Sequence, residues 1–91
     1  MQEAFKALSD PTRRRILELL KEGDLTAGEI SDQFQMAQPS VSRHLNVLRQ
    51  AGLVWTEKKG QYVTYSLNAT AFQSLLIWLA RLHNSNSDTQ S

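Results

Sequence analysis

The chain has 91 residues, the size of one domain, and its 41% hydrophobic and 21% charged residues are typical of a globular protein. It contains no cysteine, which excludes disulfides, thiolate catalysis and thiolate metal sites and fits a cytoplasmic protein. No hydrophobic run approaches the ~18 residues of a membrane span, and the N-terminus lacks a signal-peptide pattern, so we expect no membrane insertion.

The net charge of +1 is too small to indicate a nucleic-acid partner, but the charges are unevenly distributed along the chain. Residues 16–37 contain one basic and five acidic side chains, whereas residues 38–60 contain four basic side chains and one acidic side chain. A local cluster of positive charge attracts DNA more than the total charge does, so residues 38–60 are the candidate binding segment.

Two helices are predicted before Gly23, and the first of them is short and amphipathic. Asp10 is suited to cap the second helix. Arg13, Arg14 and Arg15 lie in the first turns of that helix, where cations oppose the helix macrodipole. We therefore expect Arg13 to have a compensating partner, and we favour an internal structural role for it over contact with a bound phosphate. Arg14 and Arg15 are left open as phosphate contacts.

A third, short helix and a tight turn precede the most informative segment of the chain. Thr26 and Glu29 have the spacing of a capping box, which predicts a helix that begins at this point and ends around Phe34. A longer helix follows over residues 38–50, and Gly52 is suited to end it. A short helix, a turn and a second helix with a polar outer face form the helix-turn-helix pattern.

The helix over residues 38–50 has one hydrophobic and one polar side. Val41, Leu45 and Leu48 form a stripe with helical spacing, which predicts contact with the core. The opposite side carries hydroxyl, amide and guanidinium groups, which suit hydrogen bonds to base edges, although an ordinary amphipathic surface helix is the alternative. The candidate DNA contacts on this helix are Gln38, Ser40, Ser42, Arg43 and His44, and His44 could serve in packing instead.

The alternation of β-branched and aromatic residues after Gly52 predicts a β-hairpin with a basic tip at Lys58 and Lys59. Val63, Tyr65 and Leu67 share one face of the second strand, which we expect to contact the core. Tip lysines are often simply solvated, but a hairpin beside a helix-turn-helix favours contacts of Lys58 and Lys59 with phosphates or a minor groove.

The last helix, which Asn68 or Thr70 can cap, is hydrophobic around most of its circumference. The first helix is amphipathic but has no core of its own to cover. We therefore expect both helices to pair with those of a second copy in a C2 dimer. Residues 84–91 are polar and unpatterned, and we expect them to form a disordered tail after a domain over residues 1–83. The predicted dimer contacts are Phe5, Leu8, Leu75, Leu76, Leu79 and Leu82.

Four segments in this order, ALSDPTRRRILELL, LTAGEI, QPSVSRHLNVLRQAGLV and KKGQYVTYSLN, resemble the ArsR-type winged helix-turn-helix repressors. The resemblance spans roughly residues 5–82 and is closest to the small, cysteine-free autorepressors of that family. It implies a homodimeric bacterial repressor that binds an inverted-repeat operator, with its first and last helices at the dimer interface. Autoregulation is implied only by the resemblance.

The chain departs from the metal-sensing members of the family it resembles. Many of them bind metals through a cysteine pair in the third helix, and the matching positions here are Thr26 and Gly28. Others use Asp and His ligands from the last helix, where this chain has only His83. A single imidazole does not make a metal site, so we expect no metal and no cofactor.

The sequence therefore predicts a mainly α protein with a small β-hairpin, a winged helix-turn-helix in the order α-α-α-α-β-β-α. The predicted function is a sequence-specific, double-stranded-DNA-binding repressor that acts as a homodimer; a winged helix that binds only proteins is the alternative. An enzyme is disfavoured because the chain lacks cysteine, a His–carboxylate pair at plausible spacing and a glycine-rich phosphate loop. An inducing or sequestering protein partner is left open.

Overall fold

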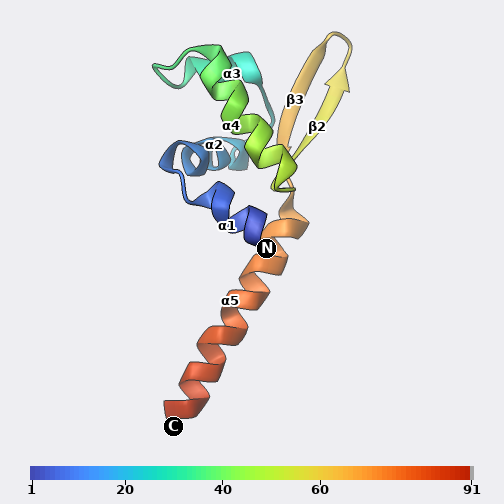
Figure 1. Cartoon of the computed structure of the whole chain (residues 1–91). Helices are drawn as coiled ribbons and strands as arrows, with labels where there is room; N and C mark the ends of the chain where they lie inside the picture. Colours follow the sequence, from blue (N-terminus) through green and yellow to red (C-terminus); the bar gives the residue numbers. More distant parts are fainter. Residues whose placement is uncertain (91) are drawn as a thin grey trace.

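The computed structural model describes the backbone of residues 1–90 and the side chains of residues 1–84. Helices α1 to α4 form a compact body, the β2–β3 hairpin projects from it on one side, and α5 extends away from it (Figure 1). The radius of gyration is 15.4 Å, against about 12 Å for a compact domain of this length. The elements in chain order are α1 (Gln2–Leu8), α2 (Pro11–Lys21), β1 (Leu25–Thr26), α3 (Ala27–Asp32), α4 (Gln38–Gln50), β2 (Val54–Lys59), β3 (Tyr62–Leu67) and α5 (Ala69–Gln90).

The predicted winged helix-turn-helix is confirmed, with one strand more than expected. β1 pairs antiparallel with β3, which gives a three-stranded sheet in the order β1-β3-β2. Leu25 lies opposite Tyr65 and Thr26 opposite Thr64. Two residues are too short to show the alternation that predicts a strand, and their partner lies about forty residues away in the chain, so sequence pattern alone could not reveal β1.

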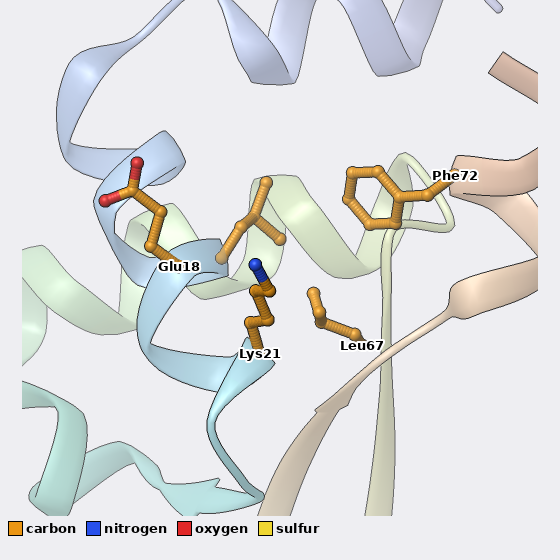
Figure 2. A pocket seen from close by; sticks show the side chains of 5 residues that line it. Glu18, Lys21, Leu67 and Phe72 are labelled. Carbon is orange, nitrogen blue, oxygen red and sulfur yellow. The ribbon is translucent and has the colours of Figure 1, made fainter. Parts of the chain in front are cut away.

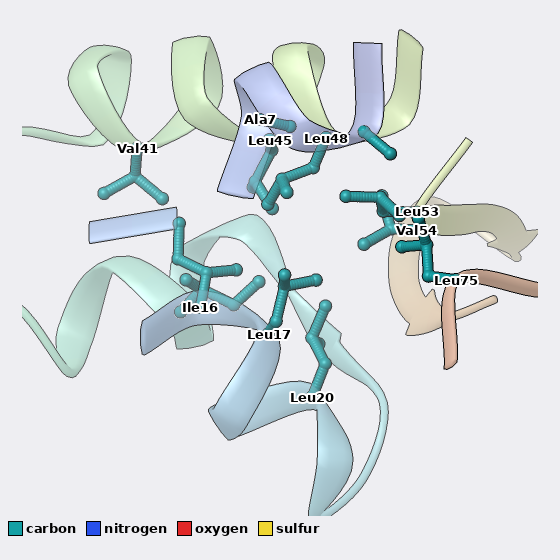
Figure 3. Close-up of a cluster of buried hydrophobic side chains, with 12 residues drawn as sticks. Ala7, Ile16, Leu17, Leu20, Val41, Leu45, Leu48, Leu53, Val54 and Leu75 are labelled. Atoms are coloured by element: carbon teal, nitrogen blue, oxygen red, sulfur yellow. The ribbon is translucent and has the colours of Figure 1, made fainter. Parts of the chain in front are cut away.

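The hydrophobic core lies between α2, α4 and the base of the sheet (Figure 3). The predicted stripe of α4 is confirmed, since Val41, Leu45 and Leu48 are fully buried. Ile16 and Ile30 bring α2 and α3 onto the same core. Fully burying a side chain of this size contributes roughly 1.5–3 kcal/mol, so this packing fixes the position of α4.

The prediction for the inner face of β3 was correct for two residues and wrong for the third. Tyr65 and Leu67 are partly buried against the core. Val63 is 43% exposed, because it lies opposite Lys58 near the tip of the hairpin, beyond the reach of the helices. The hairpin is therefore anchored at its base, and its outer half is left exposed.

The end of α1 is held by side chains from the loop and the first turn of α2. The Ser9 hydroxyl donates to the carbonyl of Lys6 over 2.6 Å, and Arg14 donates to the carbonyl of Leu8 over 2.7 Å. Arg13 donates to the carbonyls of Ala7 over 2.7 Å and Lys6 over 3.2 Å. The two arginines thus complement the negative end of α1, which offsets their unfavourable position at the start of α2. Arg13 has the internal role that we expected, and Arg14 also contacts α1.

The end of α4 is a Schellman motif that is connected to the start of α5. Leu53 N–H donates to the carbonyl of Leu48, and Gly52, with φ of +76°, donates to that of Arg49. The buried side chain of Asn68 donates to the Gly52 carbonyl over 2.8 Å and accepts from the backbone of Ala71. Asn68, rather than Thr70, therefore caps α5 and fixes where it leaves the body.

The backbone of α5 continues to Gln90, through the segment that we expected to be a disordered tail. Extending an existing helix requires no new nucleus, and residues 84–90 contain no proline or glycine to stop it. The polar composition of residues 84–91 therefore does not mark a change of backbone conformation before Gln90. Residue 91 and the side chains beyond residue 84 lie outside the described part of the structure.

Candidate nucleic-acid interface

The α3–turn–α4 unit forms as the sequence predicted, although α3 ends at Asp32 rather than around Phe34. Thr26 accepts from the backbone of Glu29 over 3.1 Å, and the Glu29 carboxylate accepts from the backbone of Thr26 over 2.8 Å. This capping box fixes the start of α3. Thr26 also belongs to β1, so the sheet and the helix-turn-helix share one residue.

The outward side of α4 is polar and accessible. At about 100° per residue, Arg43 and Asn46 lie opposite the buried stripe and Ser42 lies on the flank about 90° from it. All three are exposed. Gln38 is exposed in the first turn, whereas Ser40 is half-buried on one flank. Of the five candidate contacts on α4, Gln38, Ser42 and Arg43 are thus the exposed ones.

His44 lies on the same flank as Ser40, half-buried and turned toward α2. Its Nδ1 is 3.3 Å from the guanidinium of Arg13. This half-buried position agrees with the alternative that His44 has a packing role. No periodicity argument could have revealed the contact, because it joins residues that lie 31 positions apart in the sequence.

The carboxylate of Asp10 caps α2 next to this contact. It accepts from the backbone N–H of Thr12 over 2.8 Å and of Arg13 over 3.2 Å. Desolvation raises the pKa of the Asp10 carboxyl, but these two hydrogen bonds, together with the neighbouring charge of Arg13, outweigh it and lower the pKa below its ordinary value. Asp10 is therefore held in its charged form, which is the better cap.

The β2–β3 hairpin, which is the wing of this fold, carries Lys58 and Lys59, both exposed, on its opposite faces. Lys58 pairs with Val63, on the face that continues into the core, and Lys59 pairs with Tyr62 on the outer face. Tyr62 is 62% exposed and was not among the predicted contacts, although strand alternation does place it on the outer side. The two lysines therefore project from different faces of the hairpin.

The predicted dimer contacts divide into exposed and buried residues. Leu76, Leu79 and Leu82 are exposed on α5, and Phe5 of α1 lies against Trp78 with ring centroids 5.6 Å apart. Leu75 is buried in the core of its own chain, near the start of α5, where the helix still packs on the body. Leu8 is half-buried against the same core.

A shallow pocket of about 220 Å³ lies between α2, β3 and the first turn of α5. In Figure 2, the side chains of Phe72 and Leu67 lie on one side of the pocket, and Lys21 of α2 lies between them and Glu18. Its accessible lining is apolar, so it does not offer the polar groups that fix the orientation of a specific ligand.

Three or more His, Asp or Glu side chains do not come together in a potential metal site anywhere among the described side chains. Within the same part of the chain, none of the helices combines the length and hydrophobicity needed to cross a membrane.

The comparisons with known proteins agree with this geometry. The family model described as bacterial regulatory protein, arsR family, matches residues 10–56, from the cap of α2 to the middle of β2. The transcriptional repressor SdpR of Bacillus subtilis is 50% identical over 84 residues, which are 92% of this chain and 93% of SdpR. The transcriptional activator HlyU of Vibrio cholerae is 37% identical over 79 residues, 87% of this chain and 73% of HlyU.

A solved structure gives the same result for the fold. The solved structure of an ArsR-like transcriptional regulator from Rhodococcus sp. RHA1 superimposes with a TM-score of 0.89 at 28% identity. The match covers 94% of this chain and 79% of that one. The family model covers more than half of the chain, and SdpR is similar over nearly its full length. The chain belongs to the ArsR family of bacterial regulatory proteins.

Proposed function

We propose that this protein is a transcriptional repressor that binds double-stranded DNA as a homodimer, at an operator with inverted-repeat symmetry. The observation that carries the proposal is the outward side of α4, which combines exposed amide, hydroxyl and guanidinium groups and is held by a fully buried stripe on its other side. A rigid helix with such a side is what base recognition in a major groove requires.

The proposed contacts with DNA divide into those that select the base sequence and those that add affinity only. Arg43, Ser42 and Gln38 are the proposed base or nearby phosphate contacts, because they lie on the exposed side or in the first turn of α4. Lys58 and Lys59 extend the contact to phosphates through the wing, where charge supplies affinity without sequence choice. Ser40 remains a candidate at the flank of α4.

The dimer is proposed to form through α1 and α5. Phe5, Leu76, Leu79 and Leu82 expose hydrophobic surface that this chain leaves uncovered. A twofold interface would cover it in both copies and set the two α4 helices about 34 Å apart, one turn of B-DNA. Leu8 supports α1 from the core side, and Leu75 anchors α5 to the body.

Repression is favoured over activation because SdpR is named a repressor and is more similar to this chain than the activator HlyU. Occlusion of polymerase at an overlapping operator is the proposed mechanism. We propose neither an enzymatic activity nor a cofactor. We propose no bound metal either, since Thr26 and Gly28 offer no thiolates. The proposed site of action is the cytoplasm.

A titration in increasing salt distinguishes this function from a winged helix that binds only proteins. Purified protein is bound to duplexes that span the promoter region of its own gene and, as a control, to a shuffled duplex of equal composition. We expect preferential binding to the promoter region, affinity that falls linearly on a logarithmic salt scale, and repression of a reporter under that promoter. Absence of any salt-dependent binding would favour the protein-only alternative.

A further inference from the structure

Arg13 contacts two helices that the proposed function assigns to different tasks. Its Nε and one terminal nitrogen donate to the carbonyls of Ala7 and Lys6 at the end of α1. Its other terminal nitrogen lies 3.3 Å from Nδ1 of His44 on α4. One half-buried side chain therefore connects the helix proposed for dimerisation with the helix proposed for DNA recognition.

The chemistry of the pair fixes which atom donates. A guanidinium carries only donors and stays protonated, so Nδ1 of His44 accepts and its ring proton lies on Nε2. The planar, forked guanidinium can serve two carbonyls and a ring nitrogen in different directions at once, which a lysine ammonium on a flexible stem does not do with the same geometry. The Asp10 carboxylate accepts from the backbone N–H of Arg13, which restrains the base of this side chain.

We propose that Arg13 and His44 are positioning residues that set the orientation of α4 relative to α1. The inference rests on the proposed function and adds to it: two α4 helices reach successive major grooves only if each keeps its orientation relative to the dimer interface. His44 would then act by accepting from Arg13 rather than by contacting a base. Its half-buried place on the flank of α4 supports this role.

The test is a double-mutant cycle on DNA binding. The probe is a duplex selected for binding to the wild type from random sequence, with a shuffled duplex as reference. Arg13→Ala and His44→Ala are each expected to lower the preference for the selected duplex about tenfold, and the double variant to lower it no further than either single variant, because paired residues are not additive. The quantity compared between variants is the ratio of the affinities for the selected and the shuffled duplex, because a loss of folded protein lowers both affinities alike.

Two further variants make the result specific. His44→Asn can offer its amide oxygen to Arg13 without the Nε2 donor, so it should keep most of the preference that His44→Ala loses. Arg14→Ala removes a hydrogen-bond donor to the carbonyl of Leu8 at the end of α1, but it leaves the contact between Arg13 and His44 in place. It should therefore leave the preference for the selected duplex unchanged. The comparison of the two His44 variants stands even if Arg13→Ala fails to fold.

Three outcomes would overturn the inference. Additive effects of Arg13→Ala and His44→Ala would mean that the residues act independently. A His44→Asn variant as weak as His44→Ala would make His44 a direct DNA contact. An Arg14→Ala variant as weak as Arg13→Ala would reduce Arg13 to a cap of α1. In each case the wild type still binds the selected duplex, whereas failure of the proposed function would leave no preferred duplex at all.

Discussion

Arg43 is the residue whose chemistry most directly predicts sequence choice. It is exposed on the outward side of α4, and a bidentate contact with guanine contributes about 1–3 kcal/mol of discrimination. We expect Arg43→Ala to weaken binding to the preferred duplex by that amount and to bring it closer to a shuffled duplex. Quantitative band-shift titrations with both duplexes measure the two affinities.

Arg49 supplies the matched control for Arg43. It carries the same charge on the same helix but lies six residues, about 9 Å, further along the axis, where it donates to Asn46 over 3.0 Å. Arg49→Ala should lower the affinity for both duplexes by similar factors. If Arg43→Ala behaves like Arg49→Ala, Arg43 contacts only phosphate or solvent.

Asp10 provides a test of the body on which α4 rests. An N-cap of this kind contributes about 1 kcal/mol, so Asp10→Ala should lower the free energy of unfolding by that amount at pH 7. The folded state lowers the pKa of Asp10 below 3.8, so its charge-dependent contribution is complete above that value and is lost as the pH falls through the folded-state pKa. Urea unfolding of the wild type and of Asp10→Ala between pH 3 and pH 7 should show that their difference in free energy of unfolding shrinks only at the acidic end. A constant difference would mean that charge plays no part in the cap.

At the scale of elements, the wing is the part whose function the structure most sharpens. Lys58 and Lys59 lie on opposite faces of the hairpin, so a duplex approaching one face should involve one lysine more than the other. We expect Lys58→Ala and Lys59→Ala to differ in their effect, with the stronger variant lowering affinity for preferred and shuffled duplexes alike and reducing the salt slope by about one. Equal, small effects and an unchanged salt slope in both variants would remove the wing from the interface.

Elements with a strong local signal could be predicted from the sequence. The capping box of Thr26, the buried stripe of Val41 and its partners, and the stop at Gly52 all have local patterns, and the structure has each where it was expected. The hairpin also follows from alternation, although its inner face reaches the core only from Tyr65 onward.

What could not be predicted depends on contacts between distant segments. β1 exists because Leu25 lies opposite Tyr65, and the flank of α4 is defined by the contact of Arg13 with His44. The burial of Leu75 depends on how far α5 stays on the body before it extends away (Figure 1). Periodicity shows which residues share a face of a helix, but it does not show what that face contacts.

At the scale of the whole molecule, α5 accounts for the elongated shape, with extents of 55 × 26 × 22 Å. Leu79 is 49% exposed on the side that the proposed dimer covers. Leu79→Asp would place a charge in that hydrophobic interface, and we expect it to give monomers in sedimentation and to bind the preferred duplex far more weakly than the wild type does, since a monomer contacts one half-site only.

Ile77 is the matched control for this change, because it is 47% exposed and lies about 200° around the helix from Leu79. Ile77→Asp should remain a dimer at the same protein concentration. A dimer that survives Leu79→Asp but not Ile77→Asp would assign the interface to the opposite side of α5.

The central claim, that two copies of this chain bind one symmetric DNA site through α4, is tested most directly by selecting binding sites from random duplexes with the purified wild type. We expect the enriched sequences to share an inverted repeat with half-sites about one helical turn apart, and analytical ultracentrifugation of the selected duplex to show two protomers bound. Enrichment of no common sequence, or of a single half-site bound by one protomer, would contradict the account.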